Sequence, residues 1–302
     1  MTTNRTPATT SGGWSSLVDD MDKSLKEEIL KEYPRLTPES TFRFSCHKGI
    51  PCFTTCCADV NILLTPYDVL RMRKVLNLSS EEFLGEYVVP LLSVGQKVPL
   101  VLLKMRDDEK KTCPFVSAEG CSIYEDRPWP CRMYPVGMAS SKTEQNVEGE
   151  EFYFIMEESF ACAGLKEGKE WTVAEWWKDQ GIDDYNEKAQ PYKEITLHRR
   201  LQSIDEGKGL GPAQKQMFYM ALYDLDRFRR HLFDSRFFKL FEVENEVIEK
   251  IRQDDEALLD FGYHWLRFSL FGEPTMTIRG EVVEKGKEEL AKEMERIRGE
   301  HE

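Results

Sequence analysis

The sequence predicts an α+β fold that is mainly helical: a small cysteine-rich domain with short strands, followed by a helical C-terminal region. Three observations favour this fold. All eight cysteines lie between residues 46 and 162, and short β-prone runs precede two of them. Beyond residue 181 the pattern becomes wholly helical. We therefore expect a disordered N-terminus over 1–14, a cysteine-cluster domain over 15–180 and a helical region over 181–302.

Length and charge limit the classes of function. The chain has 302 residues, of which 40% are hydrophobic, so it can build a core without disulfide staples. Its net charge, 41 minus 54, is -13, which disfavours nucleic acid as a partner. The longest apolar run, 98–103, is far shorter than a membrane helix, and the first residues lack a secretory signal. We expect a cytoplasmic protein that does not enter membranes.

Three helices are expected in the first third of the chain. Apolar residues recur every four positions over 17–29, which predicts an amphipathic helix. Thr65, Pro66 and Asp68 form a capping box with proline at the first helical position, so a helix should begin there. A second box, 79–82, predicts a short helix that continues to Tyr87.

The later elements follow from the same signals. The runs 98–104 and 152–156 are predicted strands of one small sheet. A capping motif at 172–175 predicts a helix that Gly181 ends. The remaining predicted helices cover 191–206, 212–233, 243–261, 265–271 and 280–299.

The cysteines carry the strongest chemical signal. Thiolates are soft ligands that suit zinc, iron-sulfur clusters or cuprous copper. The spacings are C-x5-C-x3-C-C and then C-x7-C-x9-C, without the paired C-x2-C knuckles of an ordinary zinc ribbon. Buried cysteines without a metal are the plain alternative, but packing does not explain four cysteines in twelve residues. The predicted metal ligands are Cys46, Cys52, Cys56, Cys57, Cys113, Cys121, Cys131 and Cys162.

Four motifs carry a resemblance to a known family. A Cys-Cys pair near the N-terminus is followed by Cys-Pro at 113–114, by C-x-I-Y at 121–124 and by R-P-x-x-C-R-x-Y-P at 127–135. Together with the helix start at 64–68, this arrangement resembles the YkgJ-type cysteine-cluster family of zinc- or iron-chelating domains. The resemblance covers about 44–165, and it departs from the family in the wide spacing between Cys46 and Cys52.

The resemblance implies metal binding, and the cysteine cluster is also similar to that of flagellin lysine-N-methylase. We predict an iron-sulfur cluster held by cysteine thiolates, with zinc as the alternative cofactor. Arg127 and Arg132 flank Cys131, where they would offset negative charge and donate hydrogen bonds to sulfur. A cluster-containing protein lysine methylase or transferase, and a redox or metal-trafficking adaptor, are the other hypotheses. No catalytic residue is predicted.

Other features have plainer interpretations. His47 is a possible substitute ligand, and Tyr124 and Tyr134 are expected to pack beside the site. Three further histidines are expected to be structural: His198, His231 and His264. The glycine-rich stretch 207–212 is expected to be an interhelix loop, although it could contact a phosphate. The stretch 227–241 contains five basic residues and five phenylalanines. It is a candidate protein-partner face, although a core-facing helix explains it better.

Overall fold

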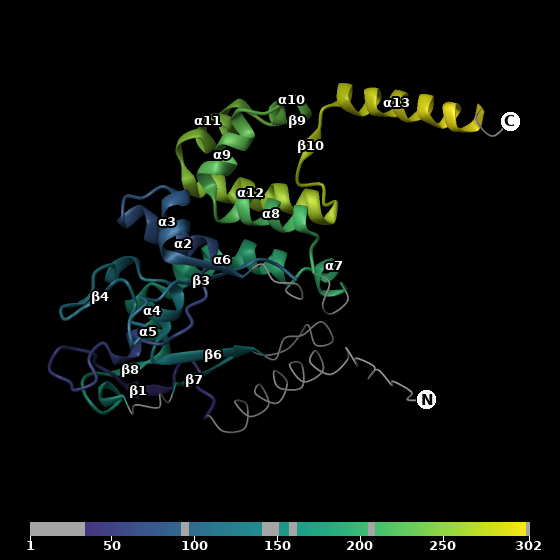
Figure 1. Ribbon diagram of the computed structural model, residues 1–302. Helices are drawn as coiled ribbons and strands as arrows, with labels where there is room; N and C mark the ends of the chain where they lie inside the picture. Colours follow the sequence, from purple (N-terminus) through teal and green to yellow (C-terminus); the bar gives the residue numbers. More distant parts are fainter. Residues whose placement is uncertain (1–33, 92–96, 141–150, 157–161, 205–208, 300–302) are drawn as a thin grey trace, which may run out of the picture. The chain divides into compact units, whose positions relative to one another are not determined.

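The computed structural model describes residues 34–91, 97–140, 151–156, 162–204 and 209–299 (Figure 1). The chain divides into two compact units. The first unit comprises Met1–Phe53 and Met133–Gln180, and the second comprises Thr54–Arg132 and Gly181–Glu302. The disorder expected over 1–14 and the helix expected over 17–29 lie outside the described residues. The predicted domains, 15–180 and 181–302, stay a prediction.

The first unit contains two small antiparallel sheets. Strand β1 (Thr41–Arg43) pairs with β8 (Glu170–Thr172), and β6 (Val136–Ser140) pairs with β7 (Glu151–Ile155). A single turn of 3-10 helix, η3, covers Ala163–Lys166.

Helix α5 (Val173–Gln180) follows β8 without a linker, and its Val173 and Trp176 are buried. The predicted cap is present, because the Glu175 amide donates to Thr172 Oγ1 over 3.1 Å. Trp176 packs edge-on against Phe42 and Phe44, with ring centroids 6.1 and 5.4 Å apart. The aromatic contacts therefore join α5 to the segment that leads into the first cysteines.

The cysteine-bearing part of the second unit consists of short elements. It includes η1 (Thr55–Cys57), β4 (Val116–Ser117), β5 (Gly120–Cys121) and η2 (Tyr124–Asp126), together with helix α4 (Trp129–Met133), whose last residue belongs to the first unit. Strands β2 (Val88–Leu91) and β3 (Leu100–Leu103) form a separate antiparallel pair. The prediction that 98–104 and 152–156 share a sheet was wrong, because each run pairs with a strand close to it in sequence.

Helices α2 (Pro66–Val75) and α3 (Ser80–Tyr87) begin where their sequences predict. In α2 the Asp68 amide donates to Thr65 Oγ1, and the Thr65 amide donates to the Asp68 carboxylate. The box of α3 repeats this exchange between Ser79 and Glu82. Both capping predictions are confirmed.

The C-terminal half is helical, as predicted, but its helices divide differently. The helix predicted over 212–233 is broken because Asp224 caps a new helix through the Arg227 amide. Asp254 likewise ends one helix and caps the next, which continues through the segment predicted as separate over 265–271. The helices are α6 (Ile182–Thr196), α7 (Arg199–Gln202), α8 (Pro212–Leu222), α9 (Leu225–Phe233), α10 (Phe237–Leu240), α11 (Asn245–Gln253), α12 (Asp255–Phe271) and α13 (Gly280–Gly299), and strands β9 (Phe241–Glu242) and β10 (Thr277–Ile278) form a short pair.

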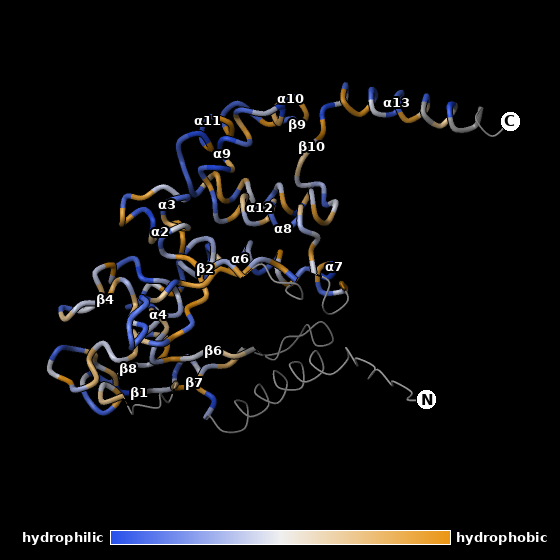
Figure 2. Tube along the Cα trace, viewed as in Figure 1, coloured by the Kyte–Doolittle hydropathy of each residue, from blue (hydrophilic) through white to orange (hydrophobic). Residues whose placement is uncertain are grey.

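The core of the second unit lies where α8 and α12 pack side by side (Figure 1). A Cβ atom on Gly262 would lie 2.6 Å from the Ala221 carbonyl oxygen, so the two helix backbones approach closely. Helix α2 contacts α6 and α12, and its Leu70 and Met72 are fully buried in this core. Figure 2 shows hydrophobic residues recurring along these helices, as amphipathic helices require. The predicted α+β, mainly helical fold is confirmed.

None of the helices within the described ranges combines the length and the apolar content needed to cross a bilayer.

Candidate metal centre

The first cysteines of the second unit, Cys56 and Cys57, lie on η1. Thr54 has a left-handed backbone with φ of 66°, and the Cys57 amide donates to the Thr54 carbonyl over 3.0 Å, which closes a tight turn. The Cys57 carbonyl in turn accepts from the Cys113 amide over 2.8 Å. An antiparallel bridge between Ala58 and Thr112 continues this pairing. Two cysteines 56 positions apart in the chain therefore lie on adjacent backbone segments.

Cys121 joins Cys113 through the β4–β5 hairpin. Val116, directly opposite Cys121 in the hairpin, donates its amide to the Cys113 carbonyl over 3.2 Å. Gly120 at the turn has φ of 108°, a backbone conformation that glycine adopts without strain. The hairpin thus returns the chain to Cys113 after only a few residues.

Cys131 lies on α4, whose start is fixed by a buried carboxylate. The Trp129 amide donates to Asp68 Oδ1 over 2.8 Å, and the Trp129 indole donates to the side chain of Asn186 over 3.0 Å. Within α4, the Cys131 amide donates to the Pro128 carbonyl over 3.0 Å. The helix is therefore anchored to both α2 and α6.

The thiols of Cys113, Cys121 and Cys131 lie close enough to influence one another electrostatically. Burial raises the pKa of all three above the usual 9.0. For Cys131 the surrounding protein atoms are the largest cause, the sulfurs of Cys113 and Cys121 add to them, and the pKa reaches about 12. The residue as a whole is nevertheless exposed.

Arg127 and Arg132 are both buried beside this group. The positive charge of Arg127 lowers the pKa of Cys121 and Cys131, which opposes the effect of burial. Arg127 also stacks over the Tyr124 ring, 3.6 Å from its centroid, and donates to the Tyr124 carbonyl. Arg132 Nε donates to the Arg127 carbonyl over 2.9 Å. The guanidinium groups thus fix the loop before α4 as well as supplying positive charge.

The carboxylate of Asp68 was missed as a site residue. It is fully buried, and burial raises its pKa, although hydrogen bonds from Thr65 and Trp129 and the charge of Arg132 oppose that effect. Its capping motif was visible in the sequence, but its bond to Trp129 spans 61 positions and no local pattern indicates it. Tyr185, beneath the Arg132 guanidinium at 4.4 Å, was missed for the same reason.

The first unit carries the other cysteines. The Ala163 amide donates to Cys52 Sγ over 3.3 Å, which brings Cys52 next to the buried Cys162. The Ser45 amide donates to the Gly164 carbonyl over 3.0 Å and joins the same two segments. Cys46 follows Ser45 and is exposed. The Cys52 sulfur is thus held by a backbone hydrogen bond, the kind of contact that orients a metal ligand.

His47 and the two predicted tyrosines have other contacts. The His47 Nδ1 atom accepts from the Gly49 amide over 3.1 Å, and Nε2 lies 3.4 Å from a Glu167 carboxylate oxygen. Both ring nitrogens are therefore engaged, which disfavours metal ligation by His47. Tyr124 is half-exposed beneath Arg127, and Tyr134 packs edge-on against Phe44 at 5.8 Å. These contacts agree with the packing role expected for the tyrosines.

The cysteine side chains suit a thiophilic metal by their chemistry, but within the described part of the chain they are not arranged around a metal position. Among the described residues, which include every cysteine, no three His, Cys, Asp or Glu side chains are arranged as a metal ion would require. The cysteines without a disulfide include Cys52, Cys57, Cys113, Cys121, Cys131 and Cys162. Free, clustered thiols are the donor type that zinc and iron-sulfur clusters take. The donor set fits, and its thiols would have to close around the ion.

The remaining sequence features belong to the fold. His198 stacks on Phe271 with ring centroids 3.6 Å apart, and His231 lies 5.7 Å from Trp265. Residues 205–208 of the glycine-rich stretch lie outside the described part of the chain. Within the candidate partner face 227–241, Phe228 is buried and Arg229 pairs with Asp255 over 2.5 Å. A core-facing role therefore explains much of that stretch.

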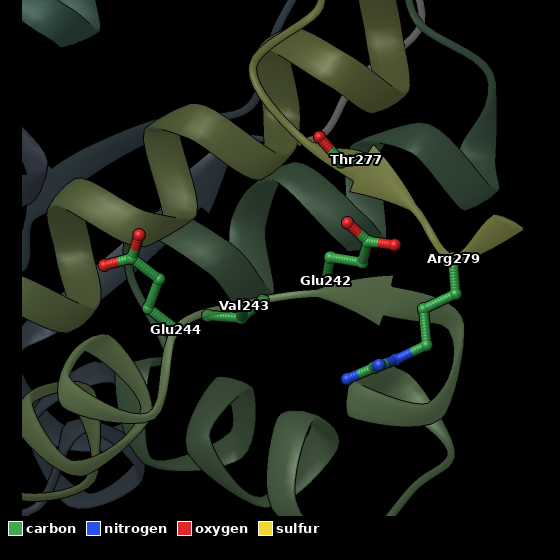
Figure 3. Close-up of a pocket in the computed structure, with 5 residues that line it drawn as sticks. All are labelled: Glu242, Val243, Glu244, Thr277 and Arg279. Atoms are coloured by element: carbon green, nitrogen blue, oxygen red, sulfur yellow. The ribbon is translucent and has the colours of Figure 1, made fainter.

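A pocket of about 460 Å³ lies at the β9–β10 pair, and the residues that line it include no cysteine (Figure 3). Two carboxylates, a guanidinium, a hydroxyl and one valine surround it: Glu242, Glu244, Arg279, Thr277 and Val243. Cofactor pockets are mostly apolar with a few polar groups, whereas this lining is mostly polar with one apolar residue. The pocket therefore gives no support to the hypothesis of a methyl-donor site.

Comparison with known proteins identifies the cysteine segment. Residues 45–159 match the family model CxxCxxCC, which is described as a putative zinc- or iron-chelating domain. Neither the curated proteins nor the solved structures provide a match, so the similarity to flagellin lysine-N-methylase stays an expectation from the motifs. The resemblance that the sequence predicted is thus confirmed, because residues 45–159 match the model of this cysteine-cluster family, whose description is a putative zinc- or iron-chelating domain.

Proposed function

We propose that the protein binds iron as an iron-sulfur cluster through cysteine thiolates. The observation that carries this proposal is that Cys57, Cys113 and Cys121 lie on adjacent hydrogen-bonded backbone segments, with Cys131 close enough to Cys113 and Cys121 for electrostatic interaction. The Cys56–Cys57 pair would supply the fourth thiolate, because the Cys57 backbone is hydrogen-bonded to that of Cys113. A bound cluster would supply electron-transfer or Lewis-acid chemistry.

The protein's own residues would prepare this site in two ways. The charge of Arg127 favours the thiolate forms of Cys121 and Cys131 against the cost of burial. The backbone of α4 and the β4–β5 hairpin hold the three sulfur-bearing residues on short, hydrogen-bonded segments. Less ordering entropy is then lost when the thiols close on a metal.

Within the first unit, considered by itself, Cys52 and Cys162 are proposed as metal ligands, together with Cys46. The hydrogen bond from the Ala163 amide to Cys52 Sγ supports this assignment, because such bonds stabilise thiolates and tune cluster potentials. Eight thiols also exceed the four that one tetrahedral zinc ion requires.

Zinc is the alternative metal, since the family description includes zinc as well as iron. The two metals are distinguished by purifying the protein without oxygen and measuring iron, acid-labile sulfide and zinc per chain. We expect iron, sulfide and broad absorption near about 400 nm. Stoichiometric zinc without sulfide would replace the iron-sulfur proposal with zinc. A Ser122→Ala variant, a neutral change beside Cys121, is the matched control and should retain the metal.

A further inference from the structure

We infer that Asp68 is the positioning residue for Cys131, because its single carboxylate caps both α2 and the helix that carries this cysteine. The inference concerns the metal-free fold and depends on the proposed function only in that Cys131 is taken as a ligand.

The two carboxylate oxygens of Asp68 have separate partners. Oδ2 accepts from the Thr65 amide over 2.8 Å and from Thr65 Oγ1 over 2.7 Å, which completes the box of α2. Oδ1 accepts from the Trp129 amide over 2.8 Å. The side chain is fully buried, so water does not compete for these donors.

Helix α4 needs this external acceptor because of its prolines. Pro128 and Pro130 have no amide hydrogen, and the amides of Cys131 and Arg132 both donate to the Pro128 carbonyl. The Trp129 amide is therefore the donor at the start of α4 that lacks an acceptor within the helix. Asp68 accepts the hydrogen bond from this amide, which lies two residues before Cys131. The position of α4, and therefore of Cys131, is thus fixed relative to α2.

The chain contains a matched comparison in the box of α3. There the Ser79 amide and hydroxyl donate to Glu82 Oε2 over 2.9 and 2.7 Å, nearly the distances found for Thr65 and Asp68. Glu82 is exposed, and within the described residues its hydrogen bonds stay inside its own box. Loss of Glu82 therefore removes a cap without affecting α4.

The test compares Asp68→Ala, Asp68→Asn, Thr65→Ala and Glu82→Ala in the full-length, metal-free, reduced protein. Hydrogen exchange of the segment 128–133 and the rate at which a neutral maleimide modifies Cys131 are measured together. We expect Asp68→Ala to raise both rates about five- to tenfold, since one buried hydrogen bond and one cap are lost. Thr65→Ala and Glu82→Ala should leave 128–133 unchanged, because Asp68 Oδ1 stays in place in both.

Asp68→Asn keeps the inference testable if Asp68→Ala does not fold. Asparagine has one acceptor oxygen in place of two, so faster exchange should occur at Trp129 or at Thr65. Equal exchange over 128–133 in Asp68→Ala and Glu82→Ala, or no change at both amides in Asp68→Asn, would overturn the role of Asp68.

A Cys131→Ser variant separates this result from the proposed function. If Cys131→Ser keeps its full metal content, the ligand assignment of Cys131 fails, while the exchange data still decide whether Asp68 positions α4. If Cys131→Ser loses metal and Asp68→Ala exchanges like the wild type, the ligand assignment stands and the positioning role fails.

Discussion

The backbone amide of Cys113 donates a hydrogen bond to the carbonyl oxygen of Cys57, with 2.8 Å between nitrogen and oxygen. This bond joins the segment of Cys56 and Cys57 to the segment of Cys113. It is made by main-chain atoms, so substitution of a cysteine side chain does not remove it. Replacing a thiol should therefore change metal binding while leaving the local backbone in place. Serine substitutions are for this reason an informative test of the ligands.

Single serine substitutions should separate ligands from bystanders. Cys52→Ser, Cys56→Ser, Cys121→Ser and Cys131→Ser should each at least halve the bound metal, because serine is a poor ligand for soft metals. Cys46→Ser should lose the least metal of these variants, since Cys46 has the widest spacing among the four cysteines of 46–57. Metal content is measured by elemental analysis beside circular dichroism. Full metal in all of the first four variants would refute the assignment.

Metal binding should strengthen as the pH rises. Burial raises the pKa of Cys113, Cys121 and Cys131, so these thiols are protonated at neutral pH and a metal must displace their protons. The apparent affinity for Fe²⁺ should increase about tenfold per pH unit for each proton displaced. Anaerobic competition with a chelator between about pH 6 and pH 8.5 measures this slope. A Cys113→Ser, Cys131→Ser double variant should have a smaller slope, and a flat wild-type profile would contradict the proposal.

The same raised pKa values set the sign of the metal-free protein's pH dependence. A thiol whose pKa is higher in the folded state than in the unfolded state contributes fully to the free energy of unfolding below about pH 9.0, the usual pKa. This contribution is lost as the pH rises toward the folded-state pKa, which is about 12 for Cys131. Urea unfolding of the metal-free protein should therefore show a declining midpoint above about pH 9.

Arg127→Gln should weaken metal binding by about ten- to a hundredfold, the range typical of residues that support metal ligands. The substitution removes the positive charge that favours the thiolates of Cys121 and Cys131. Arg230→Gln is the matched control, because Arg230 is an exposed arginine that pairs with Glu81 in the same unit. Chelator competition at fixed pH compares the two. Equal affinities in both variants would show that the charge of Arg127 does not act on the metal.

Two glycine substitutions should have opposite effects on stability. Gly262→Ala would place a Cβ atom 2.6 Å from the Ala221 carbonyl oxygen and should cost about 1–3 kcal/mol of unfolding free energy. Gly286→Ala on α13 meets nothing within 4 Å and should stabilise that helix by about 0.5–1 kcal/mol. Urea unfolding followed by circular dichroism measures both. A neutral Gly262→Ala would contradict the close approach of α8 and α12.

The local signals in the sequence predicted local structure well. The boxes at Thr65–Asp68 and Ser79–Glu82 start helices because both partners lie three residues apart and need no tertiary context. The break at Asp224 was available by the same reasoning, since an aspartate before a helical run is a good cap. It was missed because the apolar period continues across it.

The sites that depend on distant partners could not be predicted. Nothing near Cys57 indicates that its carbonyl meets the amide of Cys113, and nothing near Trp129 indicates Asp68. The motifs did identify the residue types and the family resemblance, because they are short patterns that can be read from the sequence alone. Which cysteines act as ligands stays a prediction.

The division of the second unit along the chain affects how the protein is made on the ribosome. Leu70 and Met72 of α2 bury themselves among helices that are synthesised only after Gly181. Until α8 and α12 have left the exit tunnel, the nascent chain presents the thiols of Cys113 and Cys121 without the completed core beside them. We therefore expect productive metal loading to follow the release of α12, because an earlier encounter would meet an unfinished scaffold.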